Sequence, residues 1–142
     1  MLRLWILVVT AFLASPCASA QSETGQDEAA ITSKMSSLVG TGAYACGLIK
    51  QHSALRQAWK CAQTQDSKHI AFWLAVEGHH TDSSVWHIVA RAPSGERYII
   101  FYTSNNFGQS SFAPSFTISP CHHSFKLREG GLFLFGCGKD AP

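Results

Sequence analysis

The sequence contains little charge, and this scarcity excludes several classes of protein. Only 14% of the residues are Asp, Glu, Lys or Arg, and the formal net charge is +2. The lysines and arginines are scattered singly, so no basic stripe is present that could neutralise the phosphates of a nucleic acid. No GxSxG elbow occurs, and an active site of that kind is therefore not expected. The low charge is typical of a compact domain rather than a disordered one.

The N-terminal residues predict a secretory signal peptide, residues 1–20. Arg3 supplies a short positive region, residues 4–13 form an apolar run, and residues 18–20 (Ala-Ser-Ala) match a cleavage site. The run is too short to span a bilayer, which takes about 20 apolar residues. A buried N-terminal helix is disfavoured because the run does not alternate with polar positions. Cleavage would leave residues 21–142 as a single α+β domain, periplasmic or secreted, with no membrane attachment.

The chain has five cysteines, and their spacing does not match a metal site. Neither CxxC nor a Cys/His ligand spacing occurs, so a structural zinc is not expected. Loss of the signal peptide leaves Cys46, Cys61, Cys121 and Cys137, which predict two disulfides in one of three connectivities. Cys121 and Cys137 are symmetric about Glu129 in the turn-like LREGG, so strands folded there would place them opposite one another. This favours Cys121–Cys137 and leaves Cys46–Cys61.

Two helices are predicted before residue 70. The first covers 27–38, with Asp27 near its start and two glycines at its end. The second covers 53–63, where Ser53 is a plausible N-cap. Its apolar stripe consists of Ala54, Leu55, Ala58, Trp59 and Ala62.

From residue 70 the pattern becomes typical of strands. Residues 70–78, 84–92 and 97–105 predict an antiparallel meander, and the PSGE at 93–96 predicts a turn. Residues 106–115 predict a loop, and 116–125 with 132–138 predict a last hairpin, in which Pro120 marks a bulge or an edge. One or two N-terminal helices packed on an antiparallel sheet of about five strands, cystatin-like or similar, is the predicted α+β fold.

Short elements of the strand region carry a family resemblance. They are the FW at 72–73, Gly78, the DS at 82–83, Gly95, Tyr98, Tyr102 and the SN at 104–105. With these, the chain resembles small exported bacterial domains with two disulfides, in which Cys61, Cys121 and Cys137 have counterparts. That family has no assigned activity. The resemblance therefore implies a fold and a compartment, but no reaction.

The simplest hairpin registers place Leu74 opposite His87 and His87 opposite Tyr102. One sheet face would then carry a mixed aromatic and polar surface made of Phe72, Leu74, His87, Arg91, Tyr98 and Tyr102. The second predicted helix covers roughly 16 Å of one face. The other face needs the 27–38 helix, the 106–115 loop, a second copy or a ligand. If it is not plain core, it is a surface for a protein partner or a ligand.

Three residues of the first hairpin turn could hold a metal. His79, His80 and Asp82 would give copper or zinc two imidazoles and a carboxylate. The simpler interpretation is that the histidines are solvated and that Asp82 supports the turn. His87 is about five residues along its strand, too far to join them. His122 and His123 are adjacent on a predicted strand and should point to opposite faces.

His87 itself admits two interpretations. A core histidine bonded to a tyrosine hydroxyl is the simpler one. A small secreted hydrolase or nuclease that pairs His87 with His123 is the other. The leading hypothesis is instead a binding domain without a cofactor, possessing no enzymatic activity. Its partner would be another exported protein, as for small exported inhibitors, or a second copy, and not nucleic acid or membrane.

The metal hypothesis predicts a simple titration. Refolded protein should bind Cu²⁺ or Zn²⁺, and replacing both His79 and His80 by Ala should abolish binding because two of the three ligands are lost. Calorimetric titration measures this. Sub-micromolar affinity that survives the double substitution would exclude this site.

Overall fold

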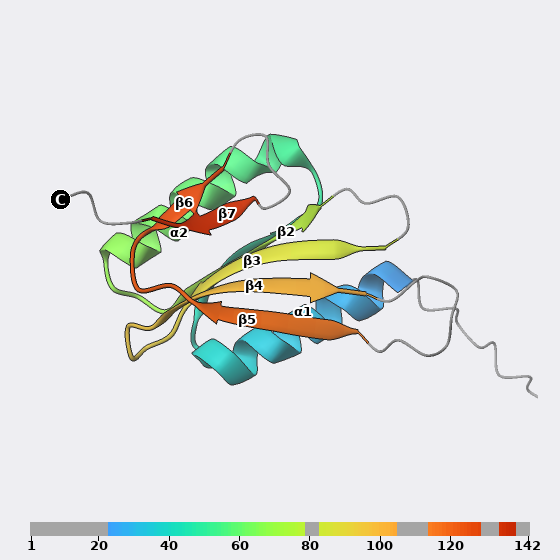
Figure 1. Ribbon diagram of the computed structural model, residues 1–142, viewed down its shortest axis with the longest axis horizontal. Helices are drawn as coiled ribbons and strands as arrows, with labels where there is room; N and C mark the ends of the chain where they lie inside the picture. The colour runs from blue at the N-terminus through green and yellow to red at the C-terminus, as the bar shows by residue number, and fades with distance from the viewer. Residues whose placement is uncertain (1–22, 79–82, 105–113, 129–133, 139–142) are drawn as a thin grey trace, which may run out of the picture.

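The computed structural model describes residues 23–78, 83–104, 114–128 and 134–138. Two helices and a five-stranded mixed sheet confirm the predicted α+β class (Figure 1). In chain order the elements are α1 (Glu23–Val39), β1 (Tyr44–Ile49), the 3₁₀ turn η1 (His52–Ala54), α2 (Leu55–Ser67), β2 (Phe72–Gly78), β3 (Val85–Arg91), β4 (Arg97–Thr103), β5 (Ser115–Pro120), β6 (Phe125–Leu127) and β7 (Phe135–Cys137). The sheet order is β1-β2-β3-β4-β5, and β6 and β7 form a separate two-stranded sheet.

The sequence pattern does not predict β1, which is an edge strand of the five-stranded sheet. It pairs in parallel with β2, so the sheet is mixed and not wholly antiparallel. Parallel neighbours need a crossover connection, and α2 supplies it between β1 and β2. The register shifts between Ala45 and Gly47, and Gly47 has a φ of 134°. This irregularity interrupts the alternating pattern by which a strand is recognised.

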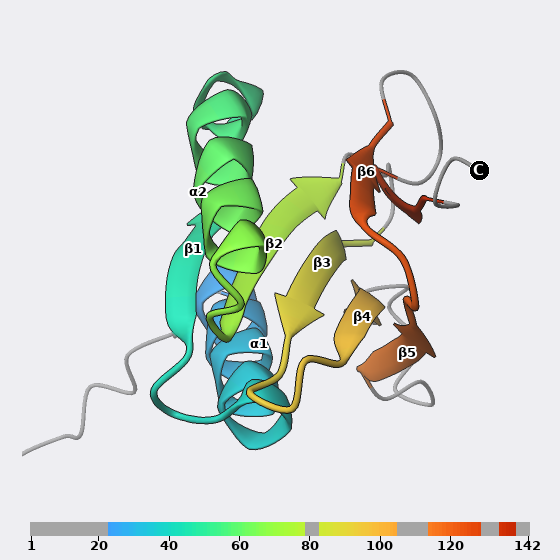
Figure 2. The ribbon, with the colours of Figure 1, turned by 90° about the vertical axis from the view of Figure 1, so that its left-hand side faces the viewer.

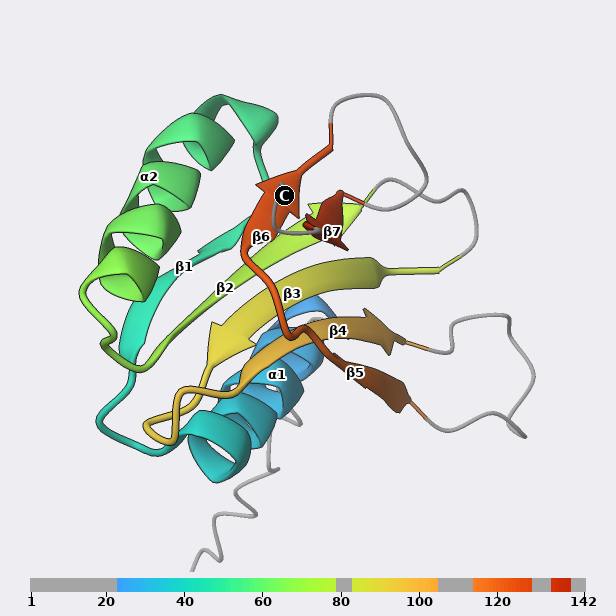
Figure 3. The same cartoon turned by 60° about the vertical axis from the view of Figure 1, so that its left-hand side comes forward.

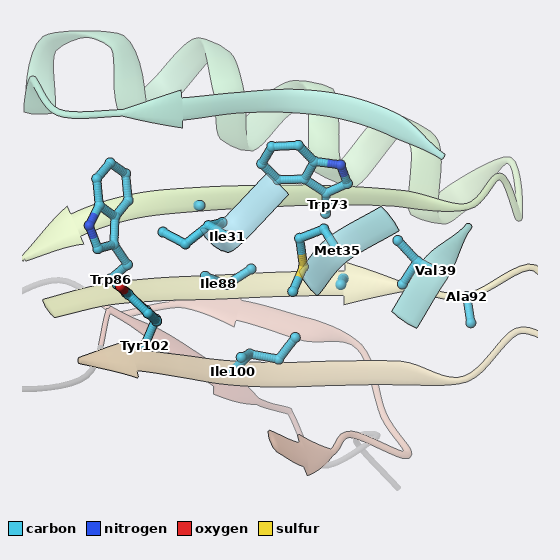
Figure 4. Packing of buried hydrophobic residues seen from close by; sticks show 11 residues of the cluster. Ile31, Met35, Val39, Trp73, Trp86, Ile88, Ala92, Ile100 and Tyr102 are labelled. Atoms are coloured by element: carbon cyan, nitrogen blue, oxygen red, sulfur yellow. The ribbon is translucent and has the colours of Figure 1, made fainter. Parts of the chain in front are cut away.

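Helix α1 covers one face of the sheet. Its buried stripe, one residue every four, consists of Asp27, Ile31, Met35 and Val39. The apolar members pack against Trp73, Trp86, Ile88 and Ile100 (Figure 4). At the end of the stripe the Tyr102 hydroxyl donates to Asp27 Oδ1 over 2.7 Å, with both residues buried. The helix begins four residues before the predicted start, and Gly40, with a φ of 89°, ends it as predicted.

Helix α2 and the β6–β7 hairpin cover the opposite face (Figure 2; Figure 3). Ala58 and Ala62 are the buried members of the helix stripe, packed with Phe72, Leu74 and Val89 of the sheet. The predicted N-cap is wrong. Ser53 lies within η1, and α2 begins after Ala54 with no side-chain cap.

Both predicted disulfides are present. Cys46 of β1 is bonded to Cys61 of α2, with 5.7 Å between their Cα atoms. Cys121 is bonded to Cys137 of β7, with 5.5 Å between their Cα atoms. The geometric reason for the second pair differs from the prediction. Cys137 lies opposite Phe125, and Cys121 lies in the connection that leads to β6.

The meander is confirmed, but both hairpin registers differ from the prediction. Leu74 lies opposite Val89, a shift of two residues, which leaves the faces of β2 and β3 unchanged. The second register is one residue off, so His87 faces Phe101 and not Tyr102. Gly95 causes this shift.

The turn around Gly95 is a three-residue hairpin loop with a bulge. The amide of Ala92 donates to Glu96 O, the amide of Gly95 donates to Ala92 O, and Gly95 has a φ of 94°. The loop is therefore Pro93-Ser94-Gly95, closed by the Ala92–Glu96 bond, and not the four-residue PSGE. A slip of one residue moves every β4 side chain to the other face.

The bond between Tyr102 and Asp27 predicts a large loss of stability in Tyr102→Phe. Removing the hydroxyl leaves a buried carboxylate without this donor, and we expect the free energy of unfolding to fall by about 2 kcal/mol. Urea unfolding measures the loss. Tyr98→Phe, which removes a hydroxyl bonded to the exposed Glu96, is the control and should cost less than about 0.5 kcal/mol.

The same bond has a pH signature. Burial, and then the hydrogen bond to Asp27, raise the pKa of the Tyr102 hydroxyl above its ordinary value of 10.0. The neutral form is thus favoured in the folded state, and its contribution is complete below about pH 10 and decreases as the pH rises further. We expect the unfolding free energy of the native chain to fall more steeply above about pH 10 than that of Tyr102→Phe. Parallel slopes would contradict this.

Candidate functional site

The predicted partner surface is divided between the two faces of the sheet. Because of the register shift in β4, Tyr98 and Tyr102 face α1, whereas Phe72, Leu74, His87 and Arg91 face α2. Phe72 and Leu74 have no exposed surface, and Tyr102 is 1% exposed. These six residues therefore do not form one open face.

The predicted metal ligands His79, His80 and Asp82 lie outside the described residues. Within the parts that the structure does describe, no cluster of three His, Cys, Asp or Glu side chains could hold a metal ion. His122 and His123 lie in the connection between β5 and β6 and not on a strand. Their predicted divergence on opposite strand faces therefore does not apply.

His87 is 5% exposed and packs edge-on against Phe101, with 5.2 Å between the ring centroids. A Cβ atom on Gly78 would lie 2.9 Å from His87 Nε2, so the strand passes close to the ring. The tyrosine partner expected for this histidine is absent from its face, because Tyr102 faces α1. The amide of Cys121 donates to the carbonyl of Arg97 in β4, and His123 follows two residues later in the connection to β6.

A cleft of about 270 Å³ lies between α2 and the start of β6, and we call it the α2–β6 cleft. Its lining residues are Trp59, Ala62, Gln63, Asp66 and Ser67 of α2, His69, Arg97 of β4, Ser124 and Phe125. Apolar rings and polar groups converge here from three separate segments. This combination is typical of ligand sites.

Packing behind the cleft fixes its two aromatic rings. Trp59 stacks on Phe135 of β7, with 5.5 Å between the centroids and 20° between the planes. Phe125 meets Phe72 edge-on at 6.1 Å. Because Phe72 and Phe135 are buried, the rings that line the cleft rest on the core. Such rings are rigid walls that cost little entropy on binding.

A charge cluster lies beside the cleft. Asp66 Oδ1 accepts from Arg91 Nη1 and from Arg97 Nε, each over 2.8 Å. The three side chains are 15%, 8% and 22% exposed. Two guanidiniums therefore share one carboxylate, and the cluster carries one net positive charge. Arg91, which the sequence places on an open sheet face, instead reaches the cleft through its contact with Asp66.

His69 completes the cluster in an unusual backbone conformation. It follows α2 with a φ of 59°, the left-handed conformation that glycine usually adopts at the end of a helix. Its Nδ1 atom lies 3.0 Å from Arg91 Nη2. Arginine can only donate, so Nδ1 accepts and the proton of the neutral ring is on Nε2. Histidine is one of the non-glycine residues that adopt this conformation more often than most.

The Ser67 hydroxyl of the cleft is not paired with the His69 ring. Ser67 Oγ donates to the Thr64 carbonyl over 2.9 Å and not to His69. A nucleophile needs a base within hydrogen-bond reach, and the His69 nitrogen that can accept is used by Arg91. Ser67 and His69 therefore do not form a nucleophile–base pair in this structure.

A second hollow of about 320 Å³ adjoins the first, and Arg97 lines both. Tyr98, a predicted partner residue, lines it and donates to Glu96 Oε2 over 2.8 Å. This hydrogen bond is the main cause that raises the pKa of the Tyr98 hydroxyl. The bond keeps the hydroxyl at the rim of the second hollow and away from the α2–β6 cleft.

Sequence reasoning did not find Trp59, Asp66, His69 or Arg97 as site residues. Trp59 was assigned to the helix stripe, and the others are spread over 32 residues. One signal was available. The helix ends in DSKHI without the glycine that normally follows a C-terminus, so a histidine had to adopt the left-handed conformation.

The shared carboxylate predicts that Asp66→Ala is strongly destabilising. Arg91 would keep a buried charge without its acidic partner, and we expect a loss of about 3 kcal/mol in the free energy of unfolding. Chemical denaturation measures this loss. Glu96→Ala removes an exposed carboxylate from the turn between β3 and β4, and it should change stability by less than about 0.5 kcal/mol. Equal losses in the two variants would show that Asp66 is not the central acceptor.

Comparison with protein-family models, curated proteins and solved structures finds no match to this chain. The resemblance to small exported bacterial domains therefore stays a prediction. Neither helix in the described ranges is long and apolar enough to cross a membrane. The structure combines a small α+β fold, two disulfides and a cleft between α2 and β6.

Proposed function

We propose that the protein is an exported binding domain that holds a small ligand in the α2–β6 cleft. The observation that carries this proposal is the position of the disulfides. Cys61 lies two residues after Trp59 on one wall, and Cys137 lies opposite Phe125 on the other. Each wall of the cleft is therefore tied down by one disulfide.

Such an arrangement suits recognition. The Cys46–Cys61 bond holds α2 against β1, and the Cys121–Cys137 bond holds the β6–β7 hairpin beside β5. A site whose walls are fixed before binding loses less entropy when the ligand enters. Disulfides also favour an oxidising compartment, the periplasm or the medium, which agrees with the predicted signal peptide.

A small ligand suits the molecule better than a broad protein partner. Both sheet faces are covered. Helix α1 packs on one face, and α2 with β6–β7 packs on the other, so neither is open to a partner protein or a second copy. The cleft volume of about 270 Å³ lies near the lower limit of about 300 Å³ for pockets that take drug-sized molecules. A fragment the size of one ring with a polar substituent fits this space.

The test is a screen with small aromatic fragments followed by amide NMR. Phenol, phenylacetate and phenylacetamide are added singly to disulfide-bonded protein covering residues 21–142. We expect shift changes to concentrate at Trp59, Ser67 and Ser124, because a ring enters between the two aromatic walls.

A blocking substitution makes the screen specific. Ser124→Phe should fill the cleft and abolish these shifts. Ser33→Phe, the same change at an exposed position of α1 on the other side of the sheet, should leave them intact. Shifts that are scattered over the surface, or that persist in Ser124→Phe, would overturn the proposal.

A further inference from the structure

We propose that the ligand of the α2–β6 cleft carries a carboxylate or a similar oxyanion, which binds to Arg97. This inference rests on the proposed binding function and adds the chemical class of the ligand. It is carried by the charge balance of the Asp66 cluster, by the unused donors of its arginines and by the hydrogen-bonded state of His69.

The charge balance of the cluster is positive. Asp66 offers one negative charge to Arg91 and Arg97, and it is the only acidic residue that lines the cleft in the described chain. His69 adds no negative charge to the cluster, and its Nδ1 atom lies against the Arg91 donor. Among the described residues that line the cleft, one positive charge therefore exceeds the negative charge. The setting is partly desolvated, so an added anion is attracted more strongly there than in water.

The arginines also have donors without acceptors. Arg97 uses Nε for Asp66, and within the described ranges no acceptor is bonded to its two terminal amino groups. Arg91 Nε is buried and likewise has no hydrogen-bond partner in that part of the chain. The planar fork of a guanidinium matches an oxyanion, and such charge-assisted bonds are about twice as strong as neutral ones.

Arg97 is the donor that a ligand can reach. Its side chain is 22% exposed and lines the cleft, whereas Arg91 is 8% exposed. Arg91 acts behind it as a positioning residue, since it anchors Asp66 and His69. His69 and Ser124 line the same space and carry groups that can donate a hydrogen bond. The cleft therefore offers mainly donors around one cation, and Trp59 and Phe125 provide the apolar walls for a ring.

The first experiment compares an acid with its amide. Phenylacetate and phenylacetamide have the same ring, and only the former is charged. We expect the acid to bind at least about tenfold more tightly in NMR titrations that follow the Trp59 indole signal. Equal affinities at the cleft would overturn the carboxylate inference and leave the proposed function standing. If neither compound shifts the cleft signals, the proposed function fails as well.

Variants assign the preference to Arg97. Arg97→Gln should reduce the affinity for phenylacetate to that for phenylacetamide, without changing the latter. Arg56→Gln removes the same charge from an exposed position of α2 and should preserve the tenfold preference. Arg97→Lys keeps the charge but loses the fork, and it should retain only part of the preference. An acid preference that survives in folded Arg97→Gln would overturn the role of Arg97. If that variant unfolds, Arg97→Lys decides, and a full tenfold preference there overturns it.

Two sources could supply such a group, a free aromatic acid or the carboxyl terminus of a peptide. The peptide Gly-Gly-Phe, with a free or an amidated terminus, is therefore titrated beside phenylacetate. Tighter binding of the free peptide than of phenylacetate indicates a peptide terminus. The reverse order indicates a small acid. An amidated peptide that binds as well as the free one would overturn the inference for either source.

Discussion

The carboxylate of Asp66 joins three parts of the chain that are distant in the sequence. It lies in the last turn of α2 and accepts from the end of β3 through Arg91 and from the start of β4 through Arg97. This acceptor contributes to the position of α2 over the sheet and, through Arg91 and Arg97, to the charge of the α2–β6 cleft. Because both arginines are largely covered, the bonds act where water screens them weakly. The cluster that links α2 to β3 and β4 also lines the α2–β6 cleft through Asp66 and Arg97.

Much of the architecture is predictable from local signals. The four cysteines predict both disulfides, and the Pro93–Gly95 turn with the apolar strand runs predicts the meander. The turn and strand signals act within a few residues, and the paired cysteines are 15 and 16 residues apart. The limits are equally physical. Strand β1 is interrupted by a bulge at Cys46 and by Gly47, so its pattern is too short to read. The face of β4 depends on whether Ala92 belongs to the strand or to the turn, and residue composition does not decide this.

The candidate site was harder to predict than the fold. Residues 59–69 meet Arg97 only because α2 crosses back over the sheet between β1 and β2, and no periodic pattern encodes that meeting. The histidines attracted attention because they are chemically versatile, yet the one at the site, His69, belongs to no motif. Its backbone conformation distinguishes it, and that property follows from the missing glycine after α2. An apolar sheet face can be buried by a helix such as α1, whose own apolar pattern is weak.

The bulge at Gly95 has a consequence that extends well beyond its turn. With a pairing register one residue away, β4 would present Tyr98, Ile100 and Tyr102 to α2, and Arg97 would be directed toward α1. Asp66 would then have a single arginine partner, and Asp27 would have no tyrosine beneath it. The length of a surface loop thus sets the electrostatic character of a cleft on one side of the molecule and the anchoring of a helix on the other. An insertion or deletion that changed the pairing of Ala92 with Glu96 by one residue would exchange the two faces of β4.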